Sequence, residues 1–202
     1  FYNQAVDNYM DEKLSAKKKP NDKGYKKGKH YTGKEHSWDE AFGYFGAAAH
    51  GLTLTAKQNY EIAKLGKKSK SPEAALKLAD YNGDGVVDLY REMNYAHAYY
   101  ASAYDKKGKT SYYKDIVQGF IDGRKLITSA DGEKLSNAQR TKLRAIAADI
   151  ESNWEKVIAE SVFKYAGSVY KDLEKLNTIM DANGNIDKVF RKYGKHWGEL
   201  KG

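Results

Sequence analysis

A long stretch without proline, from Ser136 to Met180, most constrains what this chain can fold into. It contains a single glycine, Gly167. Its apolar side chains recur every third or fourth residue, which places them on one face of an α-helix; they are Leu143, Ile146, Ile150, Trp154, Val157, Ile158, Tyr165, Val169, Leu173, Leu176 and Met180. The stretch therefore predicts either one long helix bent near Gly167 or two consecutive helices.

Other segments repeat this helical spacing. The chain has only two prolines, Pro20 and Pro72, and no segment shows the alternating pattern of a β-strand. We predict further helices over residues 1–15, 38–50, 55–65, 71–79, 87–104, 111–127 and 186–200. No coiled-coil heptad stands out. The expected fold class is all-α, an irregular up-and-down bundle of about seven helices that forms a single domain over residues 1–202.

Several helix ends carry recognisable signals. Ser37 and Glu40 have the spacing of a capping box, in which the serine caps the helix and the glutamate bonds back to it. Gly51 is the expected end of that helix. Further expected signals are a cap at Thr55, an end at Gly66 and a start at Ser71-Pro72.

Glycines mark two places where another helix can approach closely, because they carry no side chain. Gly43 and Gly46 lie in the helix after Ser37, beside three alanines. Gly119 and Gly123 are one turn apart in the predicted helix over 111–127.

The clearest binding signal is the stretch Asp80-Tyr-Asn82-Gly-Asp84-Gly85-Val86-Val-Asp88. Oxygen-bearing side chains stand at alternate positions, and Gly85 permits the turn that lets them converge on a Ca²⁺ ion. The expected ligands are the side chains of Asp80, Asn82 and Asp84, the carbonyl of Val86, and Asp88 directly or through water. Val87 is the apolar residue expected to anchor the loop.

The end of this loop departs from the EF-hand pattern. Arg91 stands where a bidentate glutamate is expected, and Glu92 follows it. Two alternatives remain for a metal site: Glu92 closes it in a variant geometry, or it is open and weaker. A third alternative is a capped turn that binds no metal. If Ca²⁺ binds, its expected role is structural, because it would join the helix that begins at Ser71 to the helix expected from Val87. A similar stretch, Asp181–Asp187, is interpreted as a turn.

The net charge of +8 is concentrated in one lysine-rich region. Its members are Lys13, Lys17, Lys18, Lys19, Lys23, Lys26, Lys27, Lys29 and Lys34. Interspersed glycines and Pro20 predict a flexible loop over residues 16–36. The region is either a surface for anionic polymers or lipid headgroups, or a solvated loop without a ligand.

Composition excludes several kinds of chemistry. The chain has no cysteine, which rules out disulfides, thiolate metal sites and cysteine catalysis. Its five histidines form no His-Glu-x-x-His or His-x-x-x-His pair, and there is no Gly-x-Ser-x-Gly, P-loop or dinucleotide motif. No apolar stretch reaches the length of a membrane span. The chain begins at Phe1 without an initiating Met, so we expect a processed chain or a fragment of a longer exported protein.

Four stretches together carry a family resemblance: Ser37–Gly46, Asp80–Glu92, Gly119–Arg124 and His196–Gly202. In this order they resemble a family of exported helical lipoproteins of unassigned function from Bacteroidota, distantly similar to imelysin-like proteins. The resemblance spans nearly the whole chain. It implies an extracytoplasmic protein at the outer membrane or cell surface, held by a lipid anchor outside this chain and associated with an outer-membrane protein complex.

The imelysin relation carries no metal site with it. Imelysin-like proteins have a Gly-x-His-x-x-Glu motif on a helix with an aromatic-glycine ending. When that helix is laid on Trp38–Gly46, Trp38 falls at the histidine and Ala41 at the glutamate. Both expected ligands are missing.

Three hypotheses for function follow. The first is a non-enzymatic, extracytoplasmic accessory or binding protein with a structural Ca²⁺ site. The second is an imelysin-like metal-dependent peptidase or iron-uptake factor, which would make the chain an enzyme or transport factor. The third is a binder of anionic polymer or lipid headgroups through the lysines over 13–34. None predicts recognition of a specific nucleic acid, and the sequence does not indicate an oligomeric state.

Overall fold

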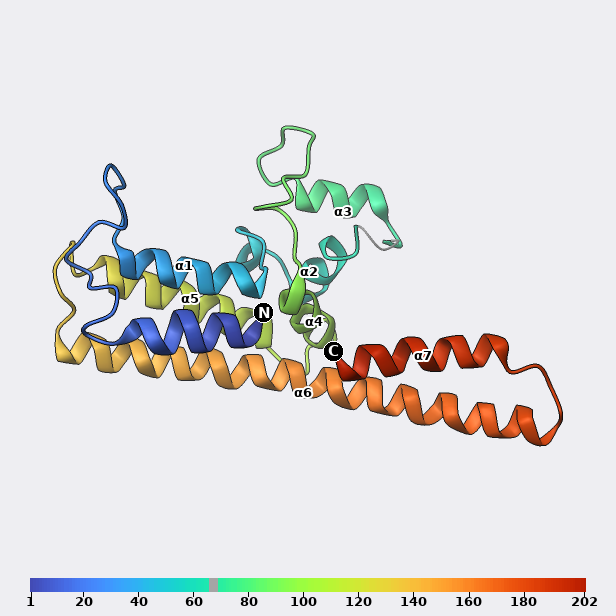
Figure 1. The fold of residues 1–202 in the computed structure, drawn as a ribbon. Coiled ribbons are helices and arrows are strands. Elements are labelled where there is room, and N and C mark those ends of the chain that lie inside the picture. Colours follow the sequence, from blue (N-terminus) through green and yellow to red (C-terminus); the bar gives the residue numbers. More distant parts are fainter. Residues whose placement is uncertain (66–68) are drawn as a thin grey trace. The chain divides into compact units, whose positions relative to one another are not determined.

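The computed structural model describes residues 1–65 and 69–202, and it confirms the all-α prediction (Figure 1). These residues form seven α-helices, one π-helix (η1) and two short 3₁₀ segments (η2 and η3), and no β-strand is found among them. The chain divides into two compact units, Phe1–Glu155 and Lys156–Gly202, which are described separately below. The prediction of a single domain stays a prediction.

The first unit contains most of the elements. In chain order they are η1 (Gln4–Asp11), η2 (Glu12–Leu14), α1 (Gly33–Phe45), η3 (Gly51–Thr53), α2 (Ala56–Ile62), α3 (Pro72–Ala79), α4 (Ala96–Asp105), α5 (Tyr112–Thr128) and the first part of α6 (Asn137–Asp181). The second unit is a hairpin of the remaining part of α6 and α7 (Asp187–Lys201).

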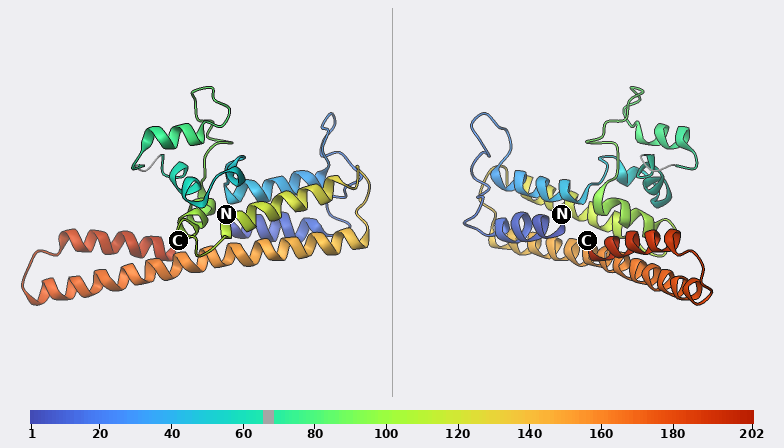
Figure 2. Two further views of the ribbon diagram at one scale, coloured as in Figure 1. Left: turned by 180° about the vertical axis from the view of Figure 1, so that it is seen from behind. Right: turned by 45° about the vertical axis from the view of Figure 1, so that its right-hand side comes forward.

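The main core of the first unit lies where η1, α1, α5 and the first part of α6 run side by side, as both views of Figure 2 show. Aromatic side chains fill its centre. Phe45 packs edge-on against Trp154 with ring centroids 5.1 Å apart, and Phe120 packs edge-on against Trp38 at 5.5 Å. Burial of these large rings supplies the main driving force for packing the four helices together.

A smaller core lies under α2 and α3. Its fully buried members are Ala48, Ile62 and Ala79, and Leu54, Leu65, Leu78 and Val87 pack against them. Val87 therefore anchors the 80–88 loop, as predicted. The loop is thereby attached to the ends of α1 and α2 as well as to α3.

The expected start of α1 was wrong by about one helical turn. Thr32, and not Ser37, is the N-cap: its hydroxyl accepts from the N–H of Glu35, and the Glu35 carboxylate accepts from the N–H of Thr32 at 2.8 Å. Ser37 lies inside the helix, where its hydroxyl donates to the carbonyl of Gly33 at 3.0 Å. Thr32 and Glu35 have the same spacing as Ser37 and Glu40, so sequence spacing alone could not separate the two capping boxes.

The expected end of α1 at Gly51 was also wrong. The helix ends at Gly46, which has the left-handed conformation that favours glycine, with φ of 82°. A Cβ added to Gly46 would lie 2.9 Å from the carbonyl oxygen of Tyr95, so the close approach of another segment also requires glycine. Gly51 instead begins η3.

The predicted start and end signals of α2 and α3 are confirmed in part. Thr55 caps α2 in a capping box with Gln58, and Pro72 is in the first turn of α3, as predicted. Ser71 makes no side-chain capping bond. The predicted end at Gly66 lies outside the described residues.

The long helix α6 runs without a break through Gly167, which decides between the two alternatives in favour of one helix. It begins after a capping box in which Ser136 and Gln139 exchange hydrogen bonds at 2.9 and 3.2 Å. None of the described helices has a stretch apolar enough and long enough to span a membrane.

Candidate functional site: the 80–92 loop

The predicted metal loop follows directly from α3. The helix ends where the N–H of Asp80 donates to the carbonyl of Leu76 at 2.8 Å. From there the chain makes two turns at glycines with left-handed backbones, Gly83 with φ of 73° and Gly85 with φ of 84°. A Cβ at either glycine would meet no atom within 4 Å, so backbone conformation and not space requires glycine there.

The oxygens in the first half of the loop converge. Asp80 Oδ1 and Asn82 Oδ1 both accept from the N–H of Asp84, at 3.1 and 3.0 Å. Asn82 Nδ2 donates to Asp84 Oδ2 at 2.8 Å. The other Asp80 oxygen accepts from the N–H of Gly85 at 2.9 Å. Three of the predicted ligand side chains are therefore gathered within one tight turn.

The second half of the loop is arranged differently. Asp88 Oδ1 accepts from the N–H of Tyr90 at 2.8 Å, and Asp88 Oδ2 lies 3.8 Å from Arg91 Nε. The Val86 side chain is exposed. In the described part of the chain, no group of three or more His, Cys, Asp or Glu side chains is arranged to hold a metal ion.

Glu92 is the central acceptor of the loop. Its side chain is only 5% exposed. One carboxylate oxygen accepts from the N–H groups of Tyr81 and Asn82 at 3.0 and 3.3 Å, and the other accepts from the N–H of Asp88 at 2.8 Å. Glu92 thereby ties the two ends of the loop together. Sequence reasoning identified it only as a candidate closing ligand.

Apart from Val87, the large apolar side chains of the loop point outward. Tyr81, Val86, Leu89 and Tyr90 are between 59% and 97% exposed, and Tyr90 is the most exposed of them. The polar side chains thus accept hydrogen bonds from the loop's own backbone, while these four apolar side chains are exposed to solvent. Such a group of exposed apolar side chains marks a candidate interaction surface.

The helix predicted from Val87 to Tyr104 was wrong in its first half. Only a turn forms near Asp88–Arg91, and α4 begins at Ala96. The chain is extended before Ala96 because its backbone pairs with the segment that follows α1. The Arg91 carbonyl accepts from the N–H of Ala49, and the N–H of Tyr95 donates to the carbonyl of Gly46, both at 2.7 Å. The loop therefore does not lie between two helices.

Asn94 fixes this extended segment in the interior. It is 1% exposed. Its Oδ1 accepts from the N–H of Ala48 and from the Tyr113 hydroxyl, both at 2.7 Å, and its Nδ2 donates to Asn59 at 3.0 Å. Burial raises the pKa of Tyr113 far above its usual range, so the phenol stays protonated and donates.

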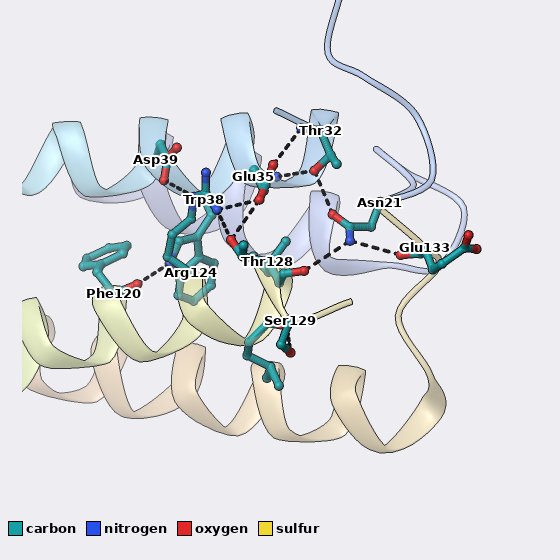
Figure 3. A network of polar contacts seen from close by, with 12 residues as sticks. Asn21, Thr32, Glu35, Trp38, Asp39, Phe120, Arg124, Thr128, Ser129 and Glu133 are labelled. Carbon is teal, nitrogen blue, oxygen red and sulfur yellow. Dashed lines mark hydrogen bonds and ion pairs between the residues drawn. The ribbon is translucent and has the colours of Figure 1, made fainter. Parts of the chain in front are cut away.

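Two of the motif stretches behind the family resemblance meet at the seam between α1 and α5 (Figure 3). Trp38 Nε1 donates to the carbonyl of Phe120 at 2.7 Å. A Cβ at Gly123 would lie 2.1 Å from the Trp38 ring, and a Cβ at Gly119 would lie 2.7 Å from Ile150. The prediction of a close-contact face at these two glycines is confirmed. For Gly43 it was wrong, because a Cβ there meets nothing within 4 Å.

Arg124 joins the two helices by ion pairs (Figure 3). It donates to Glu35 at 2.6 Å and to Asp39 at 2.9 Å. Burial opposes ionisation of Glu35, but hydrogen bonds from Thr32 and Thr128 and the Arg124 charge outweigh it and lower the pKa of Glu35. These ion pairs, together with the Trp38 contacts, hold α1 against α5.

The lysine-rich segment has fixed points inside it. Lys34 is 3% exposed, and its ammonium donates to the carbonyls of Lys13, Ser15 and Lys18 at 2.6 to 3.3 Å. Asn21 is also buried and donates to the carbonyls of Ile127 and Glu133. The predicted flexibility of residues 16–36 stays a prediction, but Lys34 is not available to a surface ligand.

The second unit contains a buried pair that sequence reasoning missed. Asp172 is 1% exposed, and its carboxylate lies 2.6 Å from His196 Nδ1 and 3.6 Å from Lys192 Nζ. Burial opposes ionisation of Asp172, but the bond to His196 and the Lys192 charge outweigh it and lower the pKa of Asp172. The pair joins α6 to α7. Nothing in the sequence spacing links residues on separate helices in this way.

Comparison with known proteins returns no counterpart: no family model, no curated protein and no solved structure matches this chain.

Proposed function

We propose that this chain is a non-enzymatic, extracytoplasmic helical accessory or binding protein whose 80–92 loop holds a structural Ca²⁺ ion and presents a partner-binding surface. The observation that carries the proposal is the arrangement of the side chains in the loop. Its carboxylate and amide oxygens converge on the loop's own backbone, and four of its apolar side chains, above all Tyr90, are exposed to solvent.

The oxygens of the first half of the loop fit a hard cation. Ca²⁺ takes about six to eight oxygen ligands and accepts flexible geometry. Asp80 Oδ1 and Asn82 Oδ1 already share one N–H, and Asp84 is bonded to Asn82. Each carboxylate oxygen that accepts one N–H retains a second lone pair for a ligand bond. The Val86 carbonyl, Asp88 and water would complete the coordination shell of the ion. Glu92 would lie next to this shell without being part of it.

Glu92 supports the ion in this proposal without closing the shell. Both of its oxygens hold backbone N–H groups. Its charge lies beneath the loop and favours a cation there. Ca²⁺ would then stiffen the connection between the end of α3 and the extended segment before α4, which is a different joint from the helix-to-helix staple expected from the sequence.

The exposed apolar side chains favour a binding role. Tyr and Arg are enriched in protein interfaces and among the residues that contribute most of the binding energy. Tyr81, Leu89 and Tyr90 stand on the loop together with Arg91, whose side chain is 80% exposed. A rigid, ion-bound loop presents such side chains at a lower entropic cost than a mobile loop.

The extracytoplasmic location, the lipid anchor outside this chain and the outer-membrane partner complex rest on the family resemblance alone. Co-purification from the native membrane tests them. Recovery of the chain in the soluble cytoplasmic fraction would contradict this part of the proposal, and it would leave the ion and the loop to be tested separately.

Calorimetric titration with Ca²⁺ tests whether the loop binds the ion. Chelator-treated wild-type protein should take up one Ca²⁺, with a rise in melting temperature that Asp84→Ala abolishes. Asp187→Ala is the matched control, because this residue follows the other Asn-Gly turn, at the start of α7, and its loss should leave Ca²⁺ uptake unchanged. Absence of both heat and thermal shift at millimolar Ca²⁺ would contradict the site.

A further inference from the structure

The hairpin of the second unit uses only part of its apolar surface internally. The side chains of α6 that face α7 are buried: Tyr165, Val169, Asp172 and Leu176. On α7, the partly buried positions are Ile186, Val189, Tyr193, His196 and Leu200. The Asp172–His196 contact shows that these two stripes face each other.

A second row of positions on α6 is exposed throughout. It consists of Ala159, Phe163, Ala166, Tyr170, Leu173, Asn177 and Met180. Successive members are alternately four and three residues apart, which is the spacing of a coiled-coil seam. Phe163 is 77% exposed and Met180 60%. No described residue covers this row, although it is nearly as apolar as the packed stripe.

A matching row lies on α7. Phe190, Gly194 and Trp197 repeat the same spacing, and all three are exposed. Counting about 100° per residue, the exposed row is about 100° from the packed stripe on α6 and about 90° from it on α7. Because the two helices run antiparallel, as Figure 1 shows for the red end of the chain, these rotations turn both rows to the same side of the hairpin.

We infer that this face binds the same face of a second copy of the chain, so that the two hairpins form a four-helix bundle. In such bundles each helix has two neighbours and therefore two apolar rows, as α6 has here. A lone hairpin provides only one neighbour. The hairpin of a second copy supplies the second neighbour for each helix.

The face is complementary to itself in shape. Large side chains alternate with small ones along the same rows: Phe163 and Tyr170 flank Ala166, and Phe190 and Trp197 flank Gly194. A Cβ at Gly194 would meet no atom within 4 Å, so the space beside it is open. Large residues of one copy can therefore fill the gaps of the other.

Asn177 favours the same conclusion. It occupies a seam position with apolar neighbours in the row on both sides, Leu173 and Met180. A single asparagine in a coiled-coil seam selects register and oligomeric state, because an unpaired amide in an apolar interface is costly.

The exposed area suits a dimer. Exposed apolar side chains on this face, including Val162 at its edge, present on the order of 700 Å² in each copy, given about 150–250 Å² for an aromatic side chain. A standard interface takes about 800 Å² from each partner.

Sedimentation of the full chain tests the inference. We expect a concentration-dependent dimer, and we expect the double variant Phe163→Glu with Tyr170→Glu to be a monomer with unchanged helical circular dichroism. The matched control, Lys171→Ser with Lys175→Ser, changes two exposed residues of α6 outside the row and should stay dimeric. A monomeric wild type, or a dimer that survives the double glutamate variant, overturns the inference.

Cross-linking gives a second test that does not depend on the glutamate variant. The chain has no cysteine, so a single Ala166→Cys introduces a unique reactive site within the row. A short bismaleimide should join two copies of Ala166→Cys and should not join two copies of Lys171→Cys. Equal cross-linking of both variants, or none of Ala166→Cys, contradicts pairing through this face.

Discussion

At the scale of single residues, glycines decide where the helices touch. Gly123 lies under the Trp38 ring, and Gly119 lies under Ile150. The sequence predicts that another helix comes close to both positions, but it does not identify the residues that do so. Their importance comes from the ring and the side chain that another helix brings against them.

The substitution Gly123→Ala should destabilise the protein by about 1–3 kcal/mol, because the new methyl group overlaps Trp38 in a tightly packed seam. Gly43→Ala in α1 is the control. It has open space and should be neutral or stabilising by up to about 1 kcal/mol through helix propensity. Urea unfolding measures both changes. Equal effects at the two positions would show that Trp38 is not packed on Gly123.

Glu151 should make stability depend on pH. Burial, and then the Asp11 carboxyl beside it, raises the pKa of Glu151 from 4.5 to about 7. The folded state therefore binds more protons than the unfolded state between these values, and stability falls as pH rises from 4.5 to 7. Glu151→Gln should raise the melting temperature at pH 8 and have little effect at pH 4. The exposed Glu160→Gln should show no such difference, and a pH-independent effect of Glu151→Gln would contradict the assignment.

At the scale of secondary-structure elements, buried polar side chains determine how segments meet. Asp105 is 2% exposed at the end of α4, and it accepts from the N–H groups of Tyr112 and Tyr113 at 3.1 and 2.7 Å. It thereby caps α5 from outside that helix. Burial raises the pKa of Asp105 against the effect of these hydrogen bonds.

Asp105→Ala should cost about 1–3 kcal/mol, because it leaves buried N–H groups at the start of α5 without acceptors. Asp115→Ala changes an exposed carboxylate in the first turn of the same helix and should cost less than about 1 kcal/mol. Thermal unfolding compares them. A larger loss for Asp115→Ala would contradict the capping role of Asp105.

The same scale explains why the helix expected from Val87 failed. Its apolar spacing suits a helix, but Glu92 and Asn94 are engaged with the loop and with Asn59, and the backbone of Arg91 and Tyr95 pairs with the segment after α1. Tertiary hydrogen bonds therefore overrode local helix preference.

At the scale of the whole molecule, the charge of the lysine-rich region can be tested as a binding surface. If it binds anionic polymer, affinity for heparin should fall steeply with salt, and replacing Lys23, Lys26, Lys27 and Lys29 by Gln should flatten that slope. Lys34 should not be among the replaced residues, because it is buried and holds three carbonyls. Binding that is weak and independent of salt would sink this alternative function.

The sequence by itself determined the all-α class, most helix positions and the turn at Asp80–Asp88. These depend on local properties: apolar spacing, capping chemistry and glycine at positive φ. Only the tertiary structure showed that Thr32, and not Ser37, caps α1. It also showed that the Glu92 carboxylate accepts hydrogen bonds from the backbone of the loop. Finally, it showed which apolar row of α6 is covered by α7 and which is exposed. Each of these depends on which distant group lies opposite a residue. A periodic stripe specifies that a face is apolar, but it does not specify what covers that face.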